Sequence, residues 1–103
     1  MTFYPQRSER FKRSYKKLSS RDQNDVDPAL RALLEDPMQG FLRTKRVQNA
    51  KSIKPAVFEA SANGNIRITW QYVDLPPNAP TGPWKGSIYF RNVGDHDITL
   101  NHP

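Results

Sequence analysis

The chain has 103 residues with a formal net charge of +6; 36% of the residues are apolar and none is cysteine. This length suits a single domain over residues 1–103 with a thin core and no large cofactor cavity, and the lack of cysteine excludes disulfides, thiolate catalysis and thiolate zinc sites. The sequence shows no signal peptide and no run of the roughly 18 apolar residues that a membrane span needs, so we expect a cytoplasmic protein without membrane contact.

The basic residues gather in two parts of the sequence. Residues 1–20 contain six basic and one acidic side chain, residues 41–56 contain five basic and no acidic ones, and residues 21–40 are net negative. Two basic segments around an acidic one predict a patch formed in three dimensions, which would suit the phosphates of a nucleic acid or an acidic protein. The alternative is an ordinary solvated surface.

Residues 6–36 have the pattern of a helical hairpin. In its first helix the apolar residues Phe11, Tyr15 and Leu18 recur at positions i, i+4 and i+7, and Ser8 is placed as the N-cap. The other face of this helix is basic and carries Arg10, Arg13, Lys16 and Lys17.

The second helix of this hairpin is expected to end at Asp36, because Pro37 pushes the residue before it out of the helical region. Ser20 begins a segment that resembles a capping box. Pro28 leaves two alternatives: it kinks the helix, or it is the first helical residue after an Asp27 N-cap. The apolar stripe consists of Val26, Ala29, Leu30, Leu33 and Leu34.

From Phe41 onward the period of the apolar residues changes from 3.6 to 2, which predicts a sheet over about residues 41–101. Residues 65–73 form the clearest strand, and the Asn63-Gly64 pair before it predicts a hairpin with residues 57–61. Two more strands are expected at residues 87–93 and 96–100. Residues 74–86 contain four of the nine prolines and are expected to form an irregular loop.

These elements predict an α+β domain in which an N-terminal helical hairpin packs on one face of a twisted, mainly antiparallel sheet of four or five strands. Strict alternation places Trp70 and Tyr72 toward the helices. It places Arg67, Gln71 and Tyr89 on the other face, which is expected to be open. An open sheet face with these side chains is a plausible platform for nucleic acid.

Three segments of the chain resemble the RelE/ParE superfamily of toxins: RFKRSYKKL, AVFEASANGNIRITWQY and YFRNVGDHDITLNHP. The strongest element is the arginine after the hairpin glycine in NGNIRITW, followed by a strand that ends in GDHDITL. Similar toxins carry a phosphate-binding arginine on that strand and, in several branches, a histidine where the last strand begins. The resemblance implies a toxin that cuts mRNA, often on the ribosome, and that a cognate antitoxin silences; operator DNA would be contacted only through the antitoxin.

Metal-independent RNA cleavage by attack of the 2′-hydroxyl needs a base, a cation at the phosphate and an acid for the leaving 5′-oxygen. We expect Arg67 to bind the phosphate, because a guanidinium offers fixed bidentate donors. Glu59 is the candidate base, and His96 the candidate acid because imidazole exchanges protons near neutral pH. The alternative is a cross-strand ion pair between Arg67 and Glu59. No cofactor or metal is expected, since His96, Asp97 and His102 lack a diagnostic ligand spacing.

Strict alternation argues against His96 as an acid, because it puts this residue on the same side as Ile98 and Leu100. A bulge near residues 94–95 would be needed to turn the ring outward; otherwise the histidine is partly buried and bonded to backbone. Two further departures from the resemblance concern the site. Some relatives use lysines where this chain has Val57 and Ser61, and many place an aromatic residue near Leu100.

Other side chains are candidates for RNA binding through their charge or their ring. Lys45 and Arg46 lie on opposite faces of their strand, so one of the two can meet the RNA. Trp84 is expected either to stack on a base or to anchor the proline-rich loop, and Asp97 either to orient a base or to close the turn. The full RNA-binding set is Arg43, Lys45, Arg46, Lys51, Lys54, Tyr89, Arg91 and Asp97.

Three functions are therefore kept apart. The first is an endoribonuclease that acts on mRNA and needs Glu59, Arg67 and His96 to converge. The second is a ParE-like inhibitor of DNA gyrase, which needs no acid–base pair and would be favoured by His96 turned into the core. The third is a non-catalytic toxin remnant that binds RNA or protein.

Overall fold

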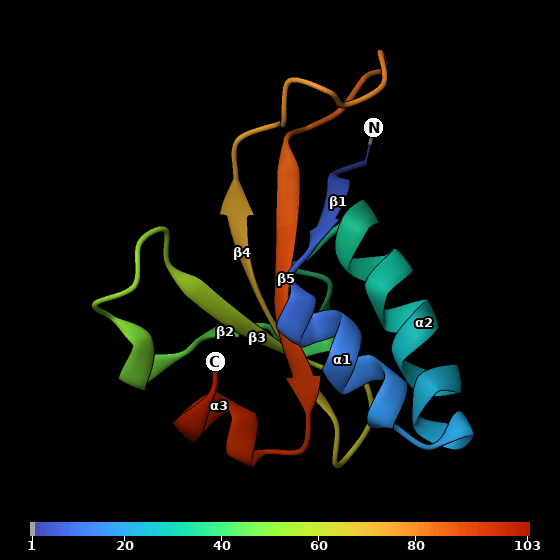
Figure 1. Cartoon of the computed structure of the whole chain (residues 1–103), viewed down its shortest axis with the longest axis vertical. Helices are drawn as coiled ribbons and strands as arrows, with labels where there is room; N and C mark the ends of the chain where they lie inside the picture. The colour runs from blue at the N-terminus through green and yellow to red at the C-terminus, as the bar shows by residue number, and fades with distance from the viewer. Residues whose placement is uncertain (1) are drawn as a thin grey trace.

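A five-stranded mixed sheet forms the middle of the molecule, with helices on both of its faces (Figure 1). The computed structural model describes residues 2–103. The strand order is β1-β5-β4-β3-β2, with β1 parallel to β5 and every other pair antiparallel. The elements are β1 (Tyr4–Arg7), α1 (Glu9–Lys17), α2 (Ser20–Glu35), β2 (Lys45–Arg46), β3 (Val57–Ser61), β4 (Arg67–Val73), β5 (Ser87–Gly94) and α3 (Asp97–Asn101), with 3₁₀ turns at Gly40–Leu42 and Gln48–Ala50.

The helical hairpin predicted from the sequence is confirmed. Ser8 caps α1, with its Oγ accepting a hydrogen bond of 2.9 Å from the Phe11 amide. The cap of α2 is Ser19, one residue before the predicted Ser20. Pro28 lies inside α2, which runs through it, so the alternative in which this proline begins the helix is wrong.

Tyr15 joins the two helices of the hairpin. Its hydroxyl donates a hydrogen bond of 2.6 Å to Asp27 Oδ1 on α2, and its carbonyl accepts one of 2.9 Å from Gln23 Nε2. The hydrogen bond to the Asp27 carboxylate raises the pKa of the Tyr15 hydroxyl above its ordinary value, and burial adds to the effect.

A Tyr15→Phe variant is expected to lose about 1 kcal/mol of unfolding free energy at neutral pH, the typical net value of one hydrogen bond. Because the pKa of this tyrosine is raised in the folded state, its contribution is complete below the ordinary value of 10.0 and is lost as the pH rises through the folded-state pKa. Urea titrations of both proteins from neutral to alkaline pH should show the difference shrinking at alkaline pH. A difference that grows there would contradict this assignment.

The strand β1 was not expected, because residues 6 and 7 were placed within the span of the helical hairpin. Its pairing with β5 is non-local, with Tyr4 opposite Ser87 and Arg7 opposite Phe90. β1 is an edge strand of the sheet, where a residue without an N–H such as Pro5 is tolerated. A four-residue strand with a proline has too short a pattern to be seen in the sequence.

The strand predicted at residues 96–100 is wrong, since β5 ends at Gly94 and the chain turns into α3. The Asp95 side chain accepts a hydrogen bond of 3.0 Å from the Asp97 amide, and its carbonyl accepts one of 3.2 Å from the Ile98 amide. An aspartate that bonds to the backbone two residues on favours a turn or a helix start over a strand. Residues 96–100 therefore form the start and body of α3 and not a strand, although apolar and polar residues alternate along them.

Close packing at Gly94 fixes α3 against the end of β5. A Cβ atom there would lie 2.9 Å from Ile98 Cγ2. Gly94→Ala is therefore expected to lower the opening free energy of α3 by about 1 kcal/mol, a modest overpacking cost. The His102 amide donates a hydrogen bond to the Ile98 carbonyl, so faster hydrogen–deuterium exchange of this amide would report the easier opening of α3. Gly40→Ala is the matched control, because a Cβ at Gly40 meets no atom within 4 Å; equal exchange in both variants would contradict the prediction.

The main core lies between the sheet and the helices α1 and α2. The alternation predicted for β4 is confirmed, since Ile68 and Trp70 are buried on the helix side with Tyr72 packed beside them. A second, smaller cluster lies on the other face, where Val47 and Ala50 pack on Val57. Together with α3, this cluster covers part of the polar sheet face that we expected to be open.

Candidate nucleic-acid interface

The polar side chains of the sheet share the face that α1 and α2 leave free. In the strand register Glu59 lies opposite Thr69, and Gln71 lies opposite Tyr89. Thr69 is fully buried; α3 contacts β4 and β5 on this face, and the segment after α3 bonds to Arg91 and Asn92. The expectation of an open platform is therefore wrong at its centre, and the accessible parts lie around α3.

Arg67 lies at the end of β4 and turns toward the hairpin between β3 and β4. Its Nη1 donates hydrogen bonds to the carbonyl oxygens of Asn63 (2.9 Å), Gly64 (3.4 Å) and Ile66 (3.2 Å). The side chain is half-buried. Only one nitrogen of its guanidinium is used by these carbonyls, so the group keeps further N–H donors for an anion.

His96 lies just before α3 and is exposed, so the alternative of a partly buried histidine is wrong about burial, but the contact with backbone that it predicted is present. Its Nε2 lies 3.3 Å from the Gly64 carbonyl oxygen, the same atom that Arg67 contacts. The bulge that we expected near residues 94–95 is not what turns the ring outward; the chain leaves the sheet there, and the register shift lies between Thr69 and Trp70. The structure thus brings Arg67 and His96 together at one carbonyl.

Glu59 is paired with Lys45 and not with Arg67. The Lys45 ammonium lies 3.5 Å from Glu59 Oε1, and only 8% of Glu59 is exposed. Thr99 and Leu100 of α3 help to enclose a hollow of about 270 Å³ beside this pair. The predicted ion pair between Arg67 and Glu59 is therefore wrong, and the cross-strand partner of Glu59 comes from β2. Of the predicted trio, two members meet at Gly64 and the third lies under α3.

Tyr89 and Arg91 lie on β5 beside the C-terminal residues. The Arg91 Nη1 donates a hydrogen bond of 2.7 Å to Gln71 Oε1, and its Nε donates one of 3.0 Å to the Pro103 carbonyl. With Arg10 of α1 they line a hollow of about 240 Å³. The sequence placed Arg10 on the basic face of a helix but carried no signal that this face meets the sheet.

The remaining predicted RNA-binding residues are exposed but scattered. Register puts Lys45 opposite Glu59, so of the two basic residues on β2 it is Lys45 that faces the polar side. Trp84 anchors the proline-rich loop. Its Nε1 donates a hydrogen bond of 2.8 Å to the Pro80 carbonyl, and its ring and that of Tyr4 pack edge to face. The others are Arg43, at the end of the first 3₁₀ turn with a φ of 53°, Arg46, Lys51, Lys54 and Asp97.

Asn63 holds the hairpin that Arg67 and His96 contact. Its Oδ1 accepts hydrogen bonds of 2.8 Å from the amides of Asn65 and Ile66, and its Nδ2 donates to carboxylates of Asp25 (2.9 Å) and Asp22 (3.2 Å) on α2. The sequence marked this residue as part of a turn, and its tie to α2 could not be foreseen from local pattern.

Asn63→Ala is expected to lower the unfolding free energy by about 1–3 kcal/mol, because it removes a hydrogen-bonded group and leaves its partners unmatched. Urea denaturation measures the effect. Asn65→Ala is the control, since the exposed Asn65 side chain makes no hydrogen bond with residues 2–103. Equal unfolding free energies of the two variants would show that the Asn63 hydrogen bonds do not stabilise the fold.

Neither a metal site nor a membrane-spanning helix is found among residues 2–103. Across residues 2–103 no three or more histidine, cysteine, aspartate or glutamate side chains are grouped so that they could hold a metal ion. None of the helices in this same range combines the length and the hydrophobicity that crossing a membrane requires.

Two solved structures resemble the chain along almost its whole length. One is a YoeB/ParE toxin from Agrobacterium tumefaciens, with a TM-score of 0.64 and 9% identity over 91% of this chain and 99% of that one. The other is a mutant of the E. coli toxin RelE in the free state, with a TM-score of 0.62 and 17% identity over 97% of this chain and 90% of that one. No protein-family model and no curated protein sequence matches the chain. At such low identity the likeness concerns the fold.

Proposed function

We propose, from the RelE/ParE fold that this chain has, that it is the toxin of a toxin–antitoxin pair and a cytoplasmic endoribonuclease that cleaves mRNA, on the ribosome or free. The observation that carries the proposal is the meeting of Arg67 and His96 at the Gly64 carbonyl, which puts a cation and a proton carrier at one end of the sheet. A cognate antitoxin is the expected partner, and operator DNA would be reached only through it.

We assign the three residues the following roles in the proposed cleavage step. Glu59 accepts the proton of the 2′-hydroxyl, and the 2′-oxygen then forms a bond to phosphorus. The Arg67 guanidinium stabilises the charge on the phosphorane oxygens. His96 gives a proton to the 5′-oxygen as its bond to phosphorus breaks, leaving a 2′,3′-cyclic phosphate and a 5′-hydroxyl. No metal takes part in this step.

RNA must displace the C-terminal end of α3 for Glu59 to act. This helix has no buried residue, and its ties to the rest of the chain include bonds from Asn49 to the Leu100 carbonyl and from Asn92 to the His102 carbonyl. Segments with few buried apolar contacts open at low free energy. A shift of the C-terminal end of α3, where Thr99 and Leu100 lie, would expose the Glu59–Lys45 pair while His96, before the helix, stays beside Arg67.

Inducible expression in bacteria with primer extension on cellular mRNA tests the proposal. Wild type should produce new 5′ ends within the first minutes, and Arg67→Ala and His96→Ala should not. Arg31→Ala on the exposed side of α2 is the matched control and should cut like wild type. Cuts that persist in both site variants would overturn the assignment of these residues.

A ParE-like inhibition of DNA gyrase is the second candidate, and a specific observation favours it. The Glu59 carboxylate is engaged by Lys45 and lies apart from Arg67 and His96, so the acid–base trio is incomplete while α3 is seated. Growth arrest with intact mRNA and induced DNA damage in the same expression experiment would support gyrase inhibition. Arrest with neither would leave the non-catalytic RNA- or protein-binding toxin.

A further inference from the structure

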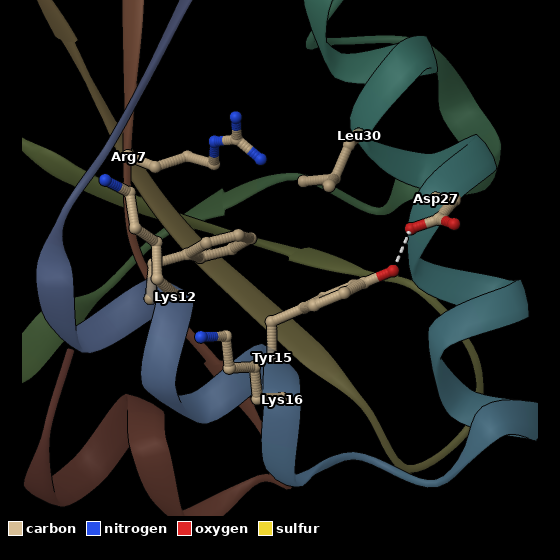
Figure 2. A pocket seen from close by; sticks show the side chains of 7 residues that line it. Arg7, Lys12, Tyr15, Lys16, Asp27 and Leu30 are labelled. Carbon is tan, nitrogen blue, oxygen red and sulfur yellow. Dashed lines mark hydrogen bonds between the residues drawn. The ribbon is translucent and has the colours of Figure 1, made fainter.

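A pocket of about 330 Å³ lies between β1, α1 and α2, on the helix side of the sheet and away from the candidate nucleic-acid interface (Figure 2). Phe11, Tyr15 and Leu30 form the apolar part of its wall. This volume is at the lower end of the range of about 300–1,000 Å³ that small-molecule sites occupy. The occupant would therefore be the size of one nucleotide.

Charge is divided across this pocket. Figure 2 shows Arg7, Lys12 and Lys16 on the side of β1 and α1, and Asp27 on the side of α2. Lys12 pairs with Glu9 at 3.4 Å, whereas Arg7 and Lys16 make no ion pair with any carboxylate in the part of the chain that the structure describes. Two free cations at one side of an apolar pocket favour a ligand with an anionic group.

The opposite wall offers a hydrogen-bond acceptor. One oxygen of Asp27 accepts the Tyr15 hydroxyl at 2.6 Å, while its Oδ2 makes no hydrogen bond with residues 2–103. A tyrosine hydroxyl is protonated at physiological pH, so the hydrogen bond from Tyr15 occupies the first oxygen there. The second oxygen can then accept from an amino group of a ligand.

We propose that this pocket binds a nucleoside monophosphate whose base carries an exocyclic amino group. The base packs between Tyr15 and Leu30 with its amino group on the free Asp27 oxygen, and the phosphate meets Arg7 and Lys16. AMP is the representative ligand, and UMP, which lacks the amino group, is the discriminating one. This site is independent of the proposed RNA cleavage.

Isothermal titration calorimetry of the full chain with AMP tests the proposal. Adenosine and ribose 5-phosphate each lack one half of the ligand, and each should bind at least about tenfold more weakly than AMP, the effect of losing a few favourable contacts. The double variant Arg7→Ala/Lys16→Ala should lose AMP affinity and keep what affinity there is for adenosine. Lys17→Ala is the matched control, because Lys17 is exposed on the same helix and does not line the pocket.

Asp27→Asn tests the recognition of the base. An asparagine Oδ1 can still accept the Tyr15 hydroxyl, but an amide nitrogen replaces the free carboxylate oxygen. The preference for AMP over UMP should disappear, and thermal unfolding should show an intact fold. AMP binding that these variants leave unchanged but that Arg67→Ala or Arg91→Ala abolishes would place the nucleotide on the sheet face and overturn the proposal. So would an absence of AMP binding, or binding of an acidic peptide in its place.

Discussion

Arg67→Ala is expected to lower the rate of mRNA cleavage by at least about 100-fold, because one charge-stabilising donor at a developing oxyanion is worth about that much or more. The Arg67 guanidinium lies at the end of β4, near His96. One of its nitrogens, Nη1, donates hydrogen bonds to carbonyls of the hairpin. The variant also loses these carbonyl bonds, so a stability measurement must accompany the rate. Cleavage of a reporter mRNA in a cell-free translation reaction gives the rate, and urea denaturation gives the stability.

Arg67→Lys separates charge from geometry. A lysine keeps the positive charge but lacks the planar fork that contacts two phosphate oxygens at once. We expect this variant to cleave faster than the alanine variant and slower than wild type, with near wild-type stability. An alanine variant that cleaves at the wild-type rate would contradict the role of Arg67, and a loss of rate that tracks a loss of folding would assign this arginine to the hairpin instead.

Trp70→Ala is expected to cost about 3–5 kcal/mol of unfolding free energy, the range for removing a large aromatic side chain from a core. Trp70 is 0% exposed, stacks on Phe58 with ring centroids 4.9 Å apart, and meets Tyr72 edge-on at 5.0 Å. Domains of this size have stabilities of about 5–15 kcal/mol, so this one change can remove most of the margin. Urea denaturation followed by circular dichroism measures it.

Trp70→Phe is the matched control for this prediction. The buried Trp70 Nε1 makes no hydrogen bond within residues 2–103, so a phenylalanine removes an unmatched donor together with part of the ring. Its cost should be clearly smaller than that of alanine. Equal costs for the two variants would show that the contacts of the ring do not determine the stability of this part of the core.

Local pattern was enough to predict much of the fold. The Ser8 cap, the end of α2 just before Pro37 and the alternation along β4 depend on residues close in sequence. Each is confirmed, with Glu35 the last residue of α2 and Asp36 its C-cap. The strand β1 and the helix α3 were missed for a shared reason. Parallel pairing of β1 with β5 joins residues more than eighty positions apart, and docking of α3 depends on Ile98 packing beside Gly94.

The candidate site was predictable in composition but not in geometry. Alternation correctly put Arg67 and Glu59 on one face, yet their partners depend on the strand register and on the path of the chain after β5. The register of β2 and β3 places Lys45 opposite Glu59, where the two form an ion pair. The turn into α3 places His96 beside the Gly64 carbonyl. Neither could follow from spacing along a single strand.

Cleavage of an mRNA with a single 5′-bridging sulfur at the cut position tests the central claim most directly, because a thiolate leaves phosphorus without needing a proton. If His96 is the acid that acts on the phosphate bound by Arg67, this substrate restores cleavage by His96→Ala and leaves Arg67→Ala slow. If the sulfur fails to rescue His96→Ala, or rescues both variants alike, the claim that His96 protonates the leaving oxygen of the phosphate bound by Arg67 is contradicted.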